Sequence, residues 1–503
     1  MSSSGIKGKI AKGAIWMVLF KFIERGIGLI STIVLARLLV PADFGVVAMA
    51  MVIIAILELM GAFGFDVTLI QRADVSDAHF NTVWTFNVMF SSVCALLLVG
   101  LAIPASIFYS EPRLEAVMYA LAVGMFAQGF ENIGVVNFRR DMQFDREFKF
   151  LVMKKIASVG VTVPLAFMLR SYWALVAGIV FGKVVSVVLS YVFHSYRPRF
   201  SLAAFGELFH FSKWLLFSNV IYFMNSKSAD FIIGKVAGAQ ALGLYNIAYE
   251  ISNLPTTELV APINRAVFPG YSRMAGDMEK LRDGFLSIIS MIALFALPIG
   301  TGIALVADLL VPTLLGEKWL AAVPVIQILS FYGVIMALQT NNGYVYLAIG
   351  KPRLVTLVNG LQLVVLLASV LTLASSRGAV GAAWAFLLTA FLLIPVNQGI
   401  IATQLHIGIR LYLGRLLRPV ISASVMSLAV ILVKNQLPAL NGFVDHFLAL
   451  LAVSLVGALV YMGTIFCAWM LAGYPDGGER FCVQKIEPFL DKVGLKINRA
   501  KAD

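Results

Sequence analysis

Apolar runs of bilayer-crossing length recur along the whole 503-residue chain. A transmembrane helix needs about 20 consecutive, mostly apolar residues, and about fourteen runs meet that criterion. They cover residues 14–36, 43–65, 81–106, 114–136, 149–169, 172–194, 212–234, 241–264, 285–308, 322–347, 354–374, 378–401, 412–434 and 444–471. Because 60% of the residues are hydrophobic and only 13% are charged, a soluble fold could not cover its own surface. The sequence therefore predicts an all-α integral membrane protein.

The formal net charge of +12 comes from basic residues gathered between the apolar runs. Nucleic-acid binding is one explanation for such a charge, but membrane topology is a better one. If the N-terminus lies in the cytoplasm, most of the 39 Lys and Arg residues fall in inner loops and tails. Inner loops of membrane proteins carry this excess. We therefore expect a multi-pass protein with both termini in the cytoplasm and no nucleic-acid partner.

The chain also contains an internal duplication. Trp16 and Gly45 are 29 residues apart, as are Trp214 and Gly243, and the two pairs are offset by 198 residues. A weaker similarity relates runs 149–169 and 172–194 to runs 354–374 and 378–401, at an offset of about 205 residues. Each copy contains six runs, so both copies enter the membrane in the same direction. Parallel repeats of this kind build transporters.

The duplication predicts the domain organisation. Two six-helix lobes surround a central cavity, and their rocking exposes it alternately to each side. The predicted segments are a cytoplasmic tail (1–12), an N-lobe (13–200), a C-lobe (201–405), an additional helix pair (406–472) and a cytoplasmic tail (473–503). Prolines at positions 255 and 262 predict a bend in run 241–264. Trp319, near the start of a run, is predicted to be an interfacial anchor.

Charged residues inside the apolar runs are the candidate binding residues. A charge at the bilayer centre costs about 2.5–3.5 kcal/mol, so it normally faces a cavity or a partner. The candidates are Lys21, Glu24 and Arg25 in the first run, Lys183 in the sixth, Lys227 and Asp230 in the seventh, and Glu250 in the eighth. One interpretation is internal ion pairing, Lys21 with Glu24 and Lys227 with Asp230. The other is a hydrated cavity for a charged substrate, although the two signs are nearly balanced.

No enzyme motif is present in the sequence. There is no Walker loop, nucleophile elbow or metalloprotease motif, and the three cysteines and five histidines show no metal-ligand spacing. The loops are too short to carry a catalytic site. We therefore expect a non-enzymatic protein without a cofactor or metal.

Three motifs resemble those of bacterial polysaccharide exporters. They are Ala36–Gly45 (ARLLVPADFG), Leu315–Pro324 (LGEKWLAAVP) and Ala348–Pro352 (AIGKP). The chain thus resembles the oligosaccharide flippases of the multidrug/oligosaccharidyl-lipid/polysaccharide superfamily, in the branch of colanic-acid, xanthan and teichuronic-acid exporters. The resemblance runs over about residues 10–400, and the lipid-linked peptidoglycan precursor flippase is similar in having an extra helix pair.

The resemblance implies a bacterial inner-membrane protein that moves an oligosaccharide repeat unit linked to undecaprenyl diphosphate toward the periplasm, for exopolysaccharide, capsule or lipopolysaccharide synthesis. A proton or sodium gradient would drive it, and a polysaccharide polymerase and a chain-length regulator are the expected partners. The alternative is a cation-coupled multidrug exporter of the same superfamily. A membrane enzyme and a non-transporting scaffold of polysaccharide synthesis are further alternatives.

Overall fold

The computed structural model describes residues 3–61, 65–71, 74–438, 440, 442–475, 477–480 and 483. These residues form helices connected by short turns, without a β-strand among them. The helices are α1 (Ser3–Leu38), α2 (Pro41–Met60), α3 (Phe65–Gln71), α4 (Asp77–Tyr109), α5 (Arg113–Gln128), η1 (Ile133–Val136), α6 (Asn137–Arg140), α7 (Phe144–Leu169), α8 (Trp173–Phe193), α9 (Phe205–Ser252), η2 (Pro255–Val260), α10 (Ala261–Met274), α11 (Met278–Leu314), η3 (Glu317–Ala322), α12 (Val323–Ala348), α13 (Pro352–Leu405), α14 (Ile409–Asn435) and α15 (Phe443–Leu471).

The helices confirm the predicted all-α membrane class. In the described part of the chain, ten helical segments are long and apolar enough to cross a membrane. One of them, α13, contains two of the predicted runs and is 54 residues long. In the described part of the chain, every predicted run coincides with a helix or with consecutive helical segments. The count of fourteen spans is therefore approximate, whereas the multi-pass architecture is secure.

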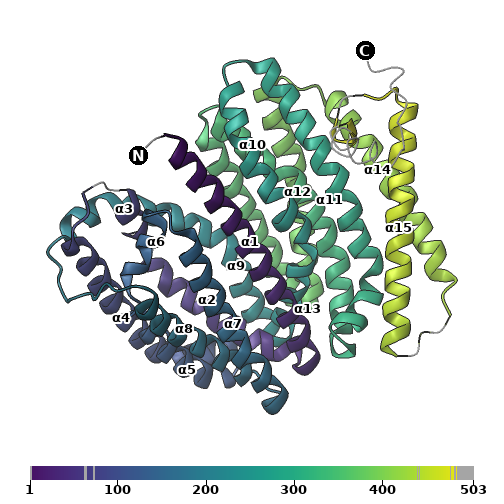
Figure 1. Ribbon diagram of the computed structural model, residues 1–503. Coiled ribbons are helices and arrows are strands. Elements are labelled where there is room, and N and C mark those ends of the chain that lie inside the picture. The colour runs from purple at the N-terminus through teal and green to yellow at the C-terminus, as the bar shows by residue number, and fades with distance from the viewer. Residues whose placement is uncertain are drawn as a thin grey trace. The chain divides into compact units, whose positions relative to one another are not determined.

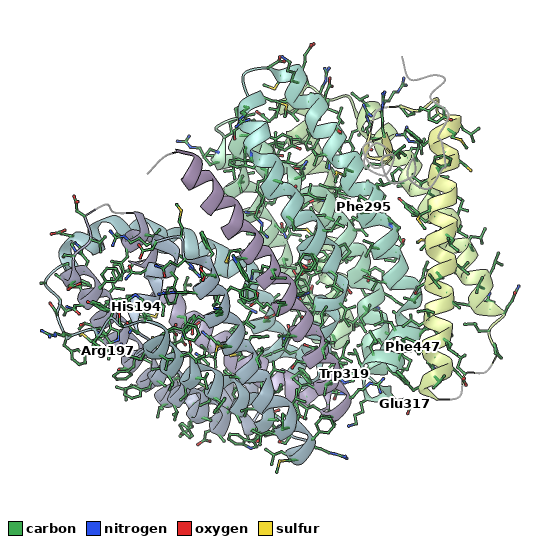
Figure 2. All side chains as sticks on the ribbon, viewed as in Figure 1. His194, Arg197, Phe295, Glu317, Trp319 and Phe447 are labelled. Atoms are coloured by element: carbon green, nitrogen blue, oxygen red, sulfur yellow. The ribbon has the colours of Figure 1, made fainter. Side chains whose placement is uncertain are left out.

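The chain divides into two compact units, Met1–Gly243 and Leu244–Asp503. In the first unit, α7 packs between α1 and α8, α8 packs on α5, and α5 contacts α2 and α4 (Figure 1). After α8, the chain runs past His194 and Arg197 (Figure 2). The segment that follows is hydrogen-bonded to α4. There the Arg199 amide donates to Asn81 Oδ1 at 2.7 Å and the Ser201 amide donates to Thr85 Oγ1 at 2.9 Å. The connection between the predicted lobes is thus held on the first unit.

The second unit is centred on α11. This helix packs on α12, α14 and α15, and α12 packs in turn on α13 (Figure 1). Buried apolar side chains of α11, α14 and α15 form one continuous core, which includes Leu294, Met426 and Val453. Tyr461 on α15 donates a hydrogen bond to the Leu294 carbonyl at 2.7 Å. The additional helix pair is therefore an integral part of this unit.

Backbone breaks fall at corresponding places in the two copies of the repeat. In the first copy α1 ends at Leu38 and α2 begins at Pro41, with Val40 extended between them. In the second copy, Gly238 interrupts α9 with φ +79° and ψ 179°. Position 238 is Val40 displaced by 198 residues. Gly378 likewise interrupts α13, between the two predicted runs. Glycine accepts a positive φ most readily, so Gly238 and Gly378 suit the conformations at these two breaks.

The structure also changes details of the sequence predictions. The helix that holds the first run begins at Ser3, so most of the predicted 1–12 tail is helical. Run 114–136 is not one helix, because α5 ends at Gln128 and the Asn132 side chain caps the separate turn η1. The predicted bend in run 241–264 is confirmed by the π-helical segment η2, which begins at Pro255. Of the predicted 473–503 tail, positions 476, 481, 482 and 484–503 lie outside the described residues.

The prediction for Trp319 is wrong. Its side chain in η3 is 0% exposed, so it is a core residue of the second unit and not an interfacial anchor. Figure 2 labels Trp319 together with Glu317 of the same short helix. The neighbouring Gly316 has a φ of +94°, which turns the chain between α11 and η3. The turn carries the indole into the protein, where it gains the stabilisation of burying a large apolar surface.

Candidate functional site

The charged residues of α1 form a local ion pair. Lys21 Nζ lies 2.7 Å from Glu24 Oε2, three residues further along the helix. The Lys21 side chain is 68% exposed and that of Glu24 is 37% exposed. Arg25 follows directly on the same helix. This helix packs on α7, where the Trp16 and Phe148 rings are 4.8 Å apart. The α1 charges therefore sit on a helix held in place by apolar contacts.

The equivalent residues of α9 repeat this arrangement. Lys227 Nζ lies 3.0 Å from Asp230 Oδ2, again at a spacing of three. The Asp230 side chain is only 10% exposed, whereas that of Lys227 is 45% exposed. The side chain of Trp214, the start of the second repeat block, lies outside the described residues. Both first-in-repeat helices thus carry an ion pair, and the internal pairing considered from the sequence is present in each.

Lys183 of α8 forms a pair that the sequence did not predict. Its Nζ lies 3.7 Å from Glu58 Oε1 of α2, and its side chain is 17% exposed. A Cβ atom at Gly124 of α5 would lie 3.4 Å from Lys183 Cδ. The small residue on α5 therefore makes room for the long stem of the lysine. A charge inside a helical bundle is tolerated where it has such a partner.

Glu250 lies in the part of α9 that belongs to the second unit. Its neighbour Tyr249 belongs to an aromatic cluster, with ring centroids 5.6 Å from Tyr245, 6.2 Å from Tyr332 and 5.9 Å from Phe386. Glu250 therefore follows directly after a tyrosine that packs against aromatic rings of α12 and α13. The sequence predictions thus fall into three pairs in the first unit and a separate carboxylate in the second.

Two lysines of α7 were missed. Lys154 and Lys155 lie inside run 149–169, and the criterion that selected Lys183 would have selected them too. Lys155 is close to α1, because a Cβ atom at Gly28 would lie 4.0 Å from Lys155 Nζ. Lys154 lines a polar cavity together with Glu58. The signal was present in the sequence, but the two lysines lie near the start of their run, close to Arg146 and Lys149.

The repeated glycines touch each other's repeat block. A Cβ atom added to Gly45 would lie 2.8 Å from Ala239 Cα, with the Ala239 carbonyl closer still. A Cβ atom added to Gly243 would lie 2.8 Å from the Pro41 carbonyl carbon and 3.1 Å from the Gly45 nitrogen. Positions 239 and 243 are 41 and 45 displaced by 198. The contact is therefore reciprocal, and we call it the glycine contact.

An ion-pair cluster lies beside the start of α2. Arg113 Nε and Nη2 each donate to Glu111 at 2.8 Å, and Arg113 Nη1 lies 3.9 Å from Asp43 Oδ1. Asp43 Oδ2 also accepts from the Val40 amide at 3.2 Å, which caps α2. The hydrogen bonds from Arg113 lower the pKa of Glu111 below its usual value. The break that precedes α2 is therefore fixed by charged side chains as well as by Pro41.

The profile of the family described as "Polysaccharide biosynthesis protein" matches residues 34–324, more than half of the chain. The chain belongs to this family. The matched region begins just before the Ala36–Gly45 motif and ends with the last residue of the Leu315–Pro324 motif. The resemblance inferred from those residues is thereby confirmed.

Curated relatives of this polysaccharide biosynthesis protein agree with the assignment. It is 26% identical over 391 residues to the lipopolysaccharide biosynthesis protein WzxC of Escherichia coli K12, covering 76% of this chain and 79% of WzxC. It is 24% identical to the teichuronic acid biosynthesis protein TuaB of Bacillus subtilis 168, covering 73% and 76%. The succinoglycan biosynthesis transport protein ExoT of Rhizobium meliloti is 23% identical, with 63% and 64% covered.

Solved structures with the same fold are membrane transporters. The lipid II flippase MurJ, in an inward closed conformation, matches with a TM-score of 0.71 at 13% identity, covering 91% of this chain and 99% of MurJ. An inward-facing multidrug resistance transporter of the MATE family matches with a TM-score of 0.54 at 15% identity, covering 76% and 95%. At these identities the likeness concerns the fold. The family member described here is thus a multi-pass membrane protein with a flippase-like fold.

Proposed function

We propose that this protein is a flippase that moves lipid-linked oligosaccharide repeat units across the bacterial cytoplasmic membrane by alternating access. The observation that carries the proposal is the family match over residues 34–324. Relatives named for lipopolysaccharide, teichuronic acid and succinoglycan synthesis support it. The larger TM-score for the lipid II flippase than for the multidrug transporter favours a lipid-linked substrate over a drug. Undecaprenyl diphosphate is the carrier that this substrate class implies.

The ion pairs suggest how the diphosphate is recruited. An exposed ion pair contributes only about 0–1 kcal/mol, so a phosphate can replace Glu24 as the partner of Lys21 at little cost. Lys227 is harder to recruit, because removing one partner of a buried pair costs about 3–5 kcal/mol and the Asp230 side chain is only 10% exposed. We therefore expect Lys21 and Arg25 to bind the diphosphate, and Lys227 to join only when Asp230 is protonated or rehydrated.

Complementation in the host tests this function. A strain that lacks the chromosomal gene should accumulate lipid-linked repeat units in the inner leaflet and lose surface polysaccharide. The unmodified chain should restore export, whereas the Lys21→Ala/Arg25→Ala double variant should not, although it should reach the membrane at a normal level. Lys434→Ala is a matched control, because its ammonium pairs with Asp308 in a different part of the chain. Normal export by the double variant would refute the role of the α1 charges. Normal polysaccharide in the deletion strain would refute the function itself.

The competing function is cation-coupled drug export. It is supported by the fold likeness to the multidrug transporter. Export of ethidium or norfloxacin by cells that produce the protein, at rates that collapse with the proton or sodium gradient, would favour it. We expect no change in drug tolerance on deletion. We also propose that both termini lie in the cytoplasm, which reporter fusions at each end would test.

A further inference from the structure

A polar cavity of about 360 Å³ lies within the first unit. It is enclosed by α2, α4, α5, α7 and the segment around η1, which belong to the same bundle in Figure 1. Its polar lining residues are Glu58, Asn87, Ser91, Gln128, Glu131, Asn132 and Lys154. Cavities of about 300–1,000 Å³ with a few convergent polar groups are typical of small-molecule sites. A polar cavity among the membrane helices therefore requires a polar occupant.

Both carboxylates of the cavity are positioned by α8. Ser186 Oγ donates to Glu131 Oε2 at 2.9 Å, and Lys183 Nζ lies 3.7 Å from Glu58 Oε1. Each interaction fixes one oxygen and leaves acceptor sites on the carboxylate for a ligand, because an ionised carboxylate offers about four lone-pair sites. Glu58 and Glu131 are therefore oriented acceptors.

The amides of the cavity complement these acceptors. Within the described residues, the side-chain amides of Asn87 and Gln128 have no hydrogen-bond partner in the protein. Each amide can donate two hydrogen bonds and accept at its oxygen. Lys154 adds an ammonium donor, and the Phe90 ring adds an apolar face to the wall. Donors, acceptors and an aromatic surface thus surround one small space.

The charges of the lining select among ligand classes. The lining holds two carboxylates, Glu58 and Glu131, and one ammonium, Lys154. Because like charges repel, this lining favours a diphosphate less than a neutral ligand. The described residues contain no group of three or more His, Cys, Asp and Glu side chains that could hold a metal ion. Hydroxyl groups both donate and accept, so they satisfy carboxylates and amides at the same time. The lining fits a neutral, hydroxyl-rich molecule best.

We propose that this cavity binds sugar residues of the translocated glycan, while the diphosphate is bound elsewhere. The proposal rests on the proposed flippase function and adds a separate site for the neutral part of the substrate. It gives Glu58 and Glu131 a role as binding groups for hydroxyls, and Lys183 a role in positioning Glu58. It also places sugar recognition on five helical segments of one unit, where the positions of the polar groups are set by packing.

Photo-crosslinking in the host tests the location of the site. Benzoylphenylalanine is placed at Phe90, which lines the cavity, or at Met89, its exposed neighbour on α4, which does not line it. After illumination of cells, the full-length protein is purified and tested for covalently attached glycan by periodate oxidation and hydrazide staining. We expect a glycan adduct at position 90 and none at position 89. An adduct at neither position, or equal adducts at both, would overturn the proposal.

Transport by cavity variants tests its role. Asn87→Leu/Gln128→Leu removes two amides of similar size to leucine, and should lower export about tenfold if each lost hydrogen bond contributes about 0.5–1.5 kcal/mol. Ser92→Ala is the control, because within the described residues Ser92 hydrogen-bonds only to the Val88 carbonyl of its own helix. The amount of purified protein and its monodispersity in detergent test whether both variants fold. If the double variant does not fold, Gln128→Leu alone is used, because Gln128 is exposed and its replacement disturbs the packing less.

The two proposals fail in different ways. If the unmodified protein restores export but folded cavity variants export normally, the sugar site is wrong and the flippase function stands. If deletion of the gene leaves polysaccharide export unchanged, the function is wrong and the sugar site with it.

Discussion

The glycine contact should control an opening of the first unit. In Gly45→Ala, the new Cβ would lie 2.8 Å from Ala239 Cα and closer to the Ala239 carbonyl. Because carbon atoms pack at about 3.5–4.0 Å, the two backbones must separate by about 1 Å or more. Overpacking of this kind costs about 1–3 kcal/mol. A shift of 1–3 kcal/mol changes a two-state equilibrium about 5–150-fold. The closed contact should therefore give way to an open one.

Chemical crosslinking measures this shift. Cysteines at Ala42 and Gln240, in a background without the three native cysteines, are treated with a short bifunctional maleimide in membranes. We expect Gly45→Ala and Gly243→Ala each to reduce the crosslinked fraction, and the double variant to add little because both break one contact. Gly100→Ala on α4 is the control, since its Cβ would meet nothing within 4 Å. Equal crosslinking in Gly45→Ala and Gly100→Ala would refute the reasoning.

Three further predictions concern the stability of the protein in detergent. Gly378→Ala should lower the free energy of unfolding by about 1–3 kcal/mol, because Gly378 has φ +57° and ψ −135°; a thermal midpoint equal to that of the Gly100→Ala control would contradict this. Glu479→Gln should lower the free energy of unfolding by about 3–5 kcal/mol, because it removes the buried carboxylate that lies 2.8 Å from Arg418. The double variant Arg418→Met/Glu479→Leu should recover most of this loss, as measured by denaturant titration. Arg113 lowers the pKa of Glu111, so this pair stabilises the fold above the unfolded pKa of about 4.3 and the stabilisation is lost as pH falls through the lower folded value. Glu111→Gln should accordingly show a shallower decline in thermal midpoint between pH 5 and about pH 3, and parallel curves would contradict it.

Much of the fold follows from local sequence signals. Span-length apolar runs predicted the helices, and the gaps between the runs, at 37–42 and 235–240, contain the break in each repeat copy. The end of helix α5 at Gln128 was not predicted, because the apolar run continues through Ile133, where Asn132 caps the separate turn η1. Trp319 was misplaced for a similar reason: hydropathy indicates that an aromatic lies near a span end, but not whether a turn at Gly316 carries it into the core.

The candidate site was predicted less completely. Spacing along one helix was sufficient for Lys21 with Glu24 and Lys227 with Asp230, because neighbours at i and i+3 share a face. The pair between Lys183 and Glu58 joins helices that are far apart in sequence, so no periodicity reveals it. The amides of Asn87 and Gln128 carry no charge, and an uncharged polar residue in a span gives a weak signal. The domain boundaries predicted from the repeat stay a prediction, since the compact units divide at Gly243.

The reciprocity of the glycine contact has an evolutionary consequence. A contact in which residue 45 meets residue 239 while residue 243 meets residue 41 is what two identical chains make across a two-fold axis. A single-copy ancestor could have formed this contact as a homodimer, with one glycine serving both sides. Fusion of the copies then freed each half to change alone. The two copies now carry different charges, Lys21, Glu24 and Arg25 in one and Lys227 and Asp230 in the other, while the glycine is the same in both.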